Sequence, residues 1–129
     1  SGDPATRIID VITFAAPTTE QERKENIALL EYRLMGRTDP DIAAEITAAT
    51  QAAASALHSL LRQTLANSGV DESALQREAL LLITLVEGFS LSAALSPTPL
   101  EEADVRAVVT ATIERLRDTY PSAPESEPR

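Results

Sequence analysis

The sequence of 129 residues contains no cysteine, no tryptophan and a single histidine, His58. Without cysteine, the chain cannot form a disulfide, a thiolate metal site or a cysteine nucleophile. One histidine is too few for a histidine metal cluster. Glycine is also rare, and the four glycines form no glycine-rich phosphate loop. These absences exclude most known types of enzyme and metal centre, so we expect no catalytic residue, no metal site and no cofactor.

Aromatic side chains are scarce as well. They make up only 3% of the chain and are Phe14, Tyr32, Phe89 and Tyr120. With so few rings, the core must consist of aliphatic and alanine side chains, which favours closely packed helices. No segment shows the alternating pattern, or the clusters of valine, isoleucine and aromatic residues, that are typical of strands. The composition therefore predicts an all-α protein.

Positive charge is in short supply. The 11 Lys and Arg residues face 20 Asp and Glu residues, which gives a formal net charge of −9. A surface this acidic repels phosphate backbones. Polar residues interrupt every apolar stretch that approaches the length of a membrane span, and no signal peptide is recognisable. We therefore expect a cytoplasmic protein whose own residues bind neither membrane nor nucleic acid.

What the sequence does contain is helical periodicity. Apolar residues recur three and four positions apart, as on one face of a helix, within residues 4–16, 18–36, 40–67, 73–95 and 98–118. The joins between these segments are short. We predict a five-helix bundle.

Capping residues mark where the helices begin. Asp3 precedes a proline, as at the start of many helices. Thr18 and Gln21 have the spacing of a capping box. Residues 98–101 (TPLE) combine a capping box with a proline at the first helical position, and this is the strongest local signal in the chain.

The helix from Leu75 to Leu95 is apolar on more than one side. Its first seam consists of Leu75, Ala79, Leu82, Val86, Phe89 and Ala93. A surface helix of a monomer needs only one such face, so the second seam predicts a homodimer. The second seam consists of Leu81, Thr84, Gly88, Leu91 and Leu95. We predict that this seam forms the dimer interface together with Ala107 and Ala111 of the last helix. Gly88 weakens a helix interior by about 1 kcal/mol, which suggests that it lets another backbone come close.

Six residues on the second, third and fourth helices are candidates for a ligand pocket. They are Tyr32, Met35, Leu57, His58, Leu61 and Glu87. Aromatic, thioether and imidazole groups are rare here, and an apolar pocket with a few polar anchors needs such a grouping. Glu87 favours a ligand with a donor or a cationic group.

Each of these residues also has a purely structural interpretation. Tyr32 and Met35 are common packing material and would then fill the core. His58 would be a half-buried histidine bonded to a carbonyl or to water. Glu87 would bond to an arginine or a hydroxyl group of a neighbouring helix. The sequence leaves both interpretations open.

Two long stretches resemble a known family. Residues 16–46 and 78–116 are similar to the C-terminal domain of TetR-family transcriptional regulators of the BetI-like subgroup. The second stretch carries the Glu87-Gly88 pair and a Ser-Pro break before the last helix. The resemblance implies a repressor domain that binds a small, often apolar effector and dimerises through its last two helices.

The same resemblance sets the domain organisation that we expect. Residues 1–2 are interpreted as a cloning remnant, residues 3–120 as the helical effector-binding and dimerisation domain, and residues 121–129 as a disordered tail. The family binds operator DNA through an N-terminal helix-turn-helix, which this chain lacks. We therefore expect a truncated regulator rather than a stand-alone relative. The alternative function is a dimeric helical scaffold without a ligand pocket, and no motif supports an enzyme.

We predict that this chain does not bind duplex DNA at physiological salt. Its net charge of −9 and its lack of a basic recognition helix both oppose such binding. The measurement is fluorescence polarisation or gel shift with a labelled duplex. Binding at micromolar protein concentrations would contradict the prediction.

Overall fold

A computed structural model describes residues 2–124, which form five α-helices and contain no strand. The helices are α1 (Pro4–Ala15), α2 (Glu20–Met35), α3 (Pro40–Thr64), α4 (Glu72–Leu95) and α5 (Glu102–Thr119). The predicted all-α fold is confirmed. Ser1 of the expected cloning remnant and residues 125–129 of the expected tail lie outside the described residues.

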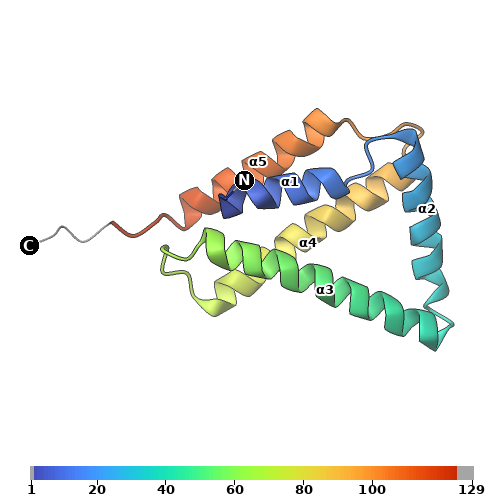
Figure 1. Cartoon of the computed structure of the whole chain (residues 1–129), viewed down its shortest axis with the longest axis horizontal. Helices are drawn as coiled ribbons and strands as arrows, with labels where there is room; N and C mark the ends of the chain where they lie inside the picture. Colours follow the sequence, from blue (N-terminus) through green and yellow to red (C-terminus); the bar gives the residue numbers. More distant parts are fainter. Residues whose placement is uncertain (1, 125–129) are drawn as a thin grey trace, which may run out of the picture.

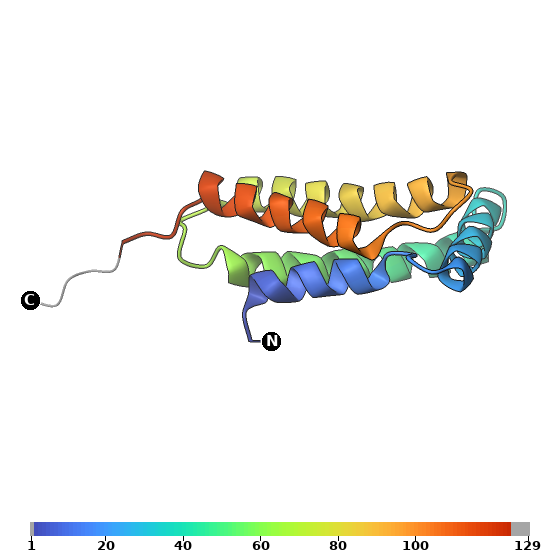
Figure 2. The ribbon, with the colours of Figure 1, turned by 90° about the horizontal axis from the view of Figure 1, so that it is seen from above.

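Four of the helices form two layers, and the other stands across one end. α4 and α5 lie over α1 and α3, as the view from above shows (Figure 2). α3 and α4 diverge toward the end of the molecule where α2 spans the distance between them (Figure 1). This wedge between α2, α3 and α4 is the feature that positions the candidate site.

The hydrophobic core lies between the two layers. Its fully buried side chains come from α1, α3, α4 and α5, and the largest of them are Ile8, Leu61, Leu82, Val105, Val109, Ile113 and Leu116. In α3 all buried residues belong to its second half, and α2 has none. The core therefore ends where α3 and α4 begin to separate.

The capping box of α2 is one residue later than predicted. Thr19 Oγ accepts a hydrogen bond from Glu22 N at 3.1 Å, and Glu22 Oε1 accepts one from Thr19 N at 3.1 Å. Thr18 and Gln21 have the same spacing, but Gln21 offers no negative charge. A carboxylate is favoured at this position because it also interacts with the positive end of the helix dipole.

The capping box predicted at residues 98–101 is wrong. α5 begins at Glu102, and its N-cap residue, Glu101, makes no side-chain capping bond. The backbone N–H of Thr98 is instead bonded to Ser96 Oγ at 3.2 Å. Pro97 and Pro99 disfavour the helical region for the residues before them, so this segment forms a non-helical link between α4 and α5.

One ion pair connects α4 and α5. Arg115 Nη2 donates to Glu78 Oε2 at 2.7 Å, and the Glu78 side chain is only 5% exposed. A buried carboxylate needs such a partner.

α4 is also the one helix in the described part of the chain that is long and apolar enough to cross a membrane by length and composition. That is weak evidence of a span, because core helices of soluble proteins pass the same test.

The hydroxyl group of Thr13 is buried in α1 without a hydrogen-bond partner among the described residues. We predict that Thr13→Val leaves the free energy of unfolding unchanged or raises it by up to about 1 kcal/mol, because valine has no polar group to desolvate. Urea unfolding followed by circular dichroism is the measurement. Thr112→Val is the control, since the Thr112 hydroxyl donates to Val108 O at 2.9 Å. A loss of stability for Thr13→Val larger than that of the control would contradict the prediction.

Candidate functional site

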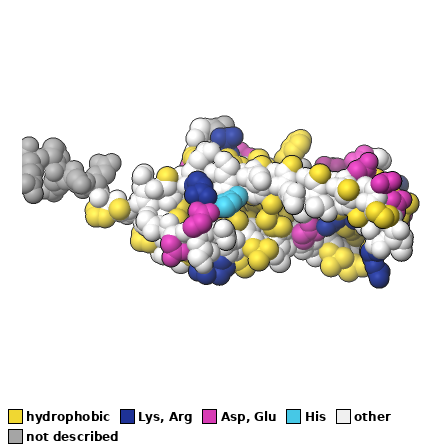
Figure 3. All heavy atoms as spheres, turned by 90° about the horizontal axis from the view of Figure 1, so that it is seen from below, with side chains coloured by type: hydrophobic (Ala, Val, Ile, Leu, Met, Phe, Trp, Pro, Cys, Tyr) yellow, Lys and Arg dark blue, Asp and Glu magenta, His cyan; other side chains and the backbone are white. Residues whose placement is uncertain are grey.

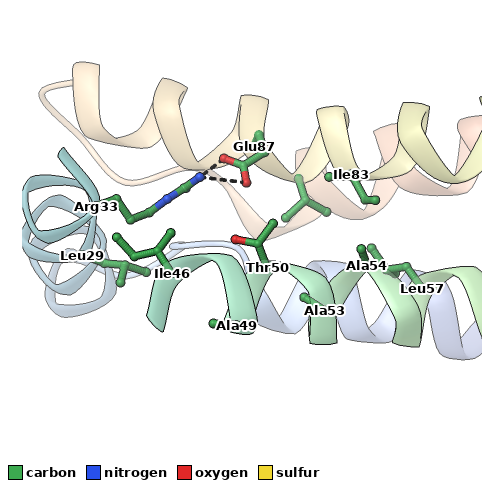
Figure 4. Close-up of a pocket in the computed structure, with 11 residues that line it drawn as sticks. Leu29, Arg33, Ile46, Ala49, Thr50, Ala53, Ala54, Leu57, Ile83 and Glu87 are labelled. Carbon is green, nitrogen blue, oxygen red and sulfur yellow. Dashed lines mark hydrogen bonds and ion pairs between the residues drawn. The ribbon is translucent and has the colours of Figure 1, made fainter. Parts of the chain in front are cut away.

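The wedge between α2, α3 and α4 contains an open cavity of about 230 Å³. It is lined by Leu29, Arg33, Ile46, Ala49, Thr50, Ala53, Ala54, Leu57, Ile83, Val86 and Glu87 (Figure 4). Three of the six α3 side chains in this lining are alanines, which are too short to fill the space between diverging helices. On the face seen in Figure 3, apolar side chains gather between the two layers. We call this space the α3 cavity.

A second cavity, of about 200 Å³, lies on the α1 side of α2. Its lining consists of Ile12, Ala15, Ala16, Pro17, Asn26, Leu29, Arg33, Val86, Glu87, Phe89 and Ser90. We call it the α1 cavity. Leu29 and Arg33 from α2, with Val86 and Glu87 from α4, line both cavities. The two spaces therefore have a common wall, which is formed by this contact between α2 and α4.

An ion pair forms the polar part of that contact. Arg33 Nη1 donates to Glu87 Oε2 at 2.9 Å, and Arg33 Nη2 donates to Glu87 Oε1 at 3.2 Å. The two side chains are 33% and 44% exposed, so water screens their attraction, and such pairs contribute about 1 kcal/mol or less. Glu87 thus has the arginine partner that its structural interpretation required. Arg33 and Glu87 are also the only charged side chains in either lining.

α2 is attached to α4 by polar contacts along its length. Arg23 Nε donates to Ser96 O at 3.1 Å. Asn26 Nδ2 donates to Ser90 O at 2.9 Å, and Ser90 Oγ donates to Asn26 Oδ1 at 2.6 Å. No residue of α2 is buried. A helix with few buried apolar contacts belongs to the low-stability part of a fold, and here that helix is a wall of both cavities.

Of the six predicted pocket residues, the structure brings only two to the α3 cavity, Leu57 and Glu87. Leu61 is completely buried in the core. Tyr32 and Met35 are 37% and 54% exposed and line neither cavity. The reason is helical geometry, because each residue is rotated by about 100° from the one before it. With Leu29 and Arg33 lining the cavities, Tyr32 lies to one side, where its hydroxyl contacts Glu45 of α3, and Met35 lies almost opposite Arg33.

Two of these side chains have polar neighbours outside the cavities. The Tyr32 hydroxyl donates to Glu45, and this bond raises the pKa of Tyr32. His58 lines a separate, shallow hollow on α3 and α4, and its Nε2 lies 3.7 Å from Glu72 Oε1. Arg62 donates to the same carboxylate oxygen at 3.0 Å, and this bond lowers the pKa of Glu72.

Sequence reasoning missed Leu29, Arg33 and Thr50, which line the α3 cavity. One signal for Arg33 was available. It lies four residues after Leu29 on α2, and one of the two interpretations of Glu87 was a bond to an arginine or a hydroxyl group of a neighbouring helix. The alanine-rich first half of α3 was a second signal, because short side chains leave space beside a helix.

The outer face of α4 is not covered by the chain itself. Leu81, Leu91 and Leu95 are 49%, 55% and 77% exposed. No atom lies within 4 Å of the position that a Gly88 side chain would take. Leu81, Thr84, Gly88 and Phe89 help to line a shallow groove on this face. On α5, the side chains of Ala107, Val108 and Ala111 are exposed, so the predicted interface residues form an accessible apolar surface.

Two of the ion pairs of α4, Arg33–Glu87 and Arg115–Glu78, should differ in their contribution to stability. We predict that Arg115→Met lowers the free energy of unfolding by about 3 kcal/mol, because it leaves the Glu78 carboxylate buried and unpaired. Arg33→Met should cost no more than about 1 kcal/mol, because Glu87 is accessible to water. Urea unfolding of both variants at low salt is the measurement. Equal losses in the two variants would contradict the prediction, because the Arg33–Glu87 pair would then stabilise the fold as much as the Arg115–Glu78 pair.

A comparison with family models agrees with this geometry. Residues 4–118 match the model of the C-terminal domain of BetI-type transcriptional repressors. Neither the comparison with curated proteins nor that with solved structures finds a match. The match covers every helix of the fold, including the wedge and the outer face of α4. The chain therefore belongs to the TetR family of transcriptional regulators, as a C-terminal domain of the BetI type.

Proposed function

We propose that this chain is the effector-binding and dimerisation domain of a transcriptional repressor. The observation that supports this most strongly concerns α4. One flank of this helix lines the α3 cavity, and its outer face is apolar and exposed. A small molecule bound at one flank would favour one position of α4, and a partner subunit on the other face would respond to it. Coupling of this kind is a shift in population between two arrangements of the dimer.

The α3 cavity has the character of a ligand site. Its lining is mainly aliphatic, with a small number of polar groups from Arg33, Thr50 and Glu87. Pockets for small molecules commonly combine apolar walls with a few polar groups that fix orientation. The effector is therefore a small, largely apolar molecule. A scaffold protein without a pocket, which is the alternative function, would be expected to have a packed interior at this place.

The outer face of α4 has the character of a subunit interface. Only 22% of the most apolar stretch of this helix is buried within the chain. Obligate dimers bury roughly 2,000 Å² or more of mainly apolar surface, and the outer faces of α4 and α5 offer such surface. Two copies of these helices would form a four-helix bundle. In this proposal operator DNA binds to another part of the parent protein, and the regulator acts in the cytoplasm.

For the dimer, we predict that the chain sediments at twice its mass of 13.8 kDa. Leu91→Glu should give a monomer, because it places a charge in the proposed interface. Leu34→Glu is a matched control on α2, since Leu34 is 62% exposed and Leu91 is 55% exposed. Analytical ultracentrifugation at micromolar concentration is the measurement. A monomeric unmutated chain, or equal behaviour of the two variants, would contradict the proposal.

For the ligand site, we predict that some compounds in a library of apolar small molecules raise the melting temperature of the chain. A ligand at about 100 times its Kd stabilises the folded state by about 2.7 kcal/mol. Ala53→Phe should abolish this effect by filling the α3 cavity, whereas Ala52→Phe should not, because Ala52 does not line it. Thermal melts with and without each compound are the measurement. If no compound stabilises the unmutated chain, the effector site is rejected.

A further inference from the structure

We propose that the α1 cavity and the α3 cavity are two halves of one effector site, closed at its centre by the Arg33–Glu87 ion pair. The effector that fits this site is an elongated, neutral and mostly apolar molecule with an amide-like group near its middle. This inference rests on the proposed function, and it names the class of ligand and the way in which the site opens.

The sizes of the two cavities support a divided site. They measure about 230 Å³ and 200 Å³, and pockets that enclose a drug-sized ligand measure about 300–1,000 Å³. Each cavity alone falls below that range, and the two together fall within it. Their common wall consists of only four side chains, two from α2 and two from α4.

The wall is built so that it can open. The wall consists of side-chain contacts between two helices. Its ion pair is partly exposed to water and is therefore a weak contact. α2, which carries Leu29 and Arg33, has no buried residue that would be pulled out of the core. The Glu78–Arg115 pair on the same α4 is different, because its carboxylate is buried against α5. Of these two pairs, only Arg33–Glu87 lies between two spaces that a ligand can fill.

The two charges of the open wall determine the chemistry of the ligand. After the pair separates, the Arg33 guanidinium offers only donors, and the Glu87 carboxylate offers only acceptors. A ligand carboxylate would satisfy Arg33 but would repel Glu87, and an ammonium group would do the reverse. A neutral group with one acceptor and one donor satisfies both. A secondary amide has this combination, with a carbonyl for Arg33 and an N–H for Glu87.

The position of the polar group follows from the rest of the lining. Beyond the ion pair, the α3 cavity is bounded by the alanines of α3 and by Ile83. On the other side, the α1 cavity is bounded mainly by Ile12, Ala15 and Phe89, and its two uncharged polar side chains, Asn26 and Ser90, are bonded to each other. Mainly apolar walls therefore extend in both directions from the charged centre. A molecule whose polar group lies at one end would leave either Arg33 and Glu87 without a hydrogen-bond partner or one of the two cavities empty.

The first test compares four linear probes of similar length with the purified chain. They are N-hexylhexanamide, hexyl hexanoate, dodecanoate and dodecylammonium, each kept below the concentration at which it aggregates. Isothermal titration calorimetry is the measurement. We expect the amide to bind about tenfold more tightly than the ester, because the ester leaves Glu87 without a donor. Equal affinity for the ester, or tightest binding of either charged probe, would overturn the proposal.

The second test uses variants of the wall and of each cavity. Arg33→Met should weaken amide binding about tenfold. Arg106→Met is the control, because Arg106 forms an ion pair of similar length with Asp10 outside both cavities. Ala53→Phe and Ala15→Phe block the α3 cavity and the α1 cavity respectively, and each alone should reduce amide binding at least tenfold if one molecule spans both. Amide binding that survives Ala15→Phe or Arg33→Met unchanged would overturn the proposal.

These outcomes separate this inference from the function on which it rests. If library compounds stabilise the chain and depend on Ala53 but the amide does not bind, the divided site is wrong and the effector domain stands. If no compound binds at all, both are rejected.

Discussion

The apolar circumference of α4 is the constraint on which the rest of this fold depends. α3 packs against part of this helix, α5 pairs with its one buried carboxylate, and α2 bonds to its C-terminal half. These neighbours leave most of its apolar stretch uncovered. Part of the remainder becomes the wall of the α3 cavity, and part becomes the outer face. The proposed ligand site and the proposed dimer interface thus have one origin, which is a helix too apolar for a single chain of this size to cover.

α2 has the opposite character. It is long and regularly capped, yet it contributes nothing to the core. Its apolar side chains are at most partly buried, and the hydrogen bonds and the ion pair that join it to α4 are individually weak where water has access. A fold can tolerate such a helix at an end of the molecule, because its displacement exposes little apolar surface. A regulator benefits from it, because an element with few buried contacts responds to a ligand that a rigid core would exclude.

The sequence was informative wherever the cause of a structure is local. Helical periodicity predicted five helices, and the two seams of residues 75–95 predicted a helix with a buried side and an exposed apolar side. The start of α5 was mispredicted, because Pro97 and Pro99, just before and within residues 98–101, overrule a favourable capping pattern. These prolines were visible in the sequence, but we interpreted one of them as part of the helix.

The candidate site could be predicted only in part. Leu57 and Glu87 belong to the helices whose faces are fixed by burial, and the structure places both in the α3 cavity. Tyr32 and Met35 belong to α2, whose inward face is set by the polar contacts of its Asn26 and Arg33 with α4 rather than by burial. Apolar periodicity carries no information about such a choice. The angle at which α3 and α4 diverge is likewise a property of the whole packing arrangement.

The pairing of the first helix with the last has a consequence for the synthesis of the protein. Asp10 of α1 is bonded to Arg106 of α5 across 96 positions of the sequence, and Ile8 and Val109 share one core. A contact of such long range costs more loop-closure entropy than a local one. On the ribosome, α1 can pack against α3 first, but the part of its apolar face that α5 covers stays open until α5 has emerged. The nascent chain is therefore most exposed to aggregation and to proteases in the interval before α5 has emerged.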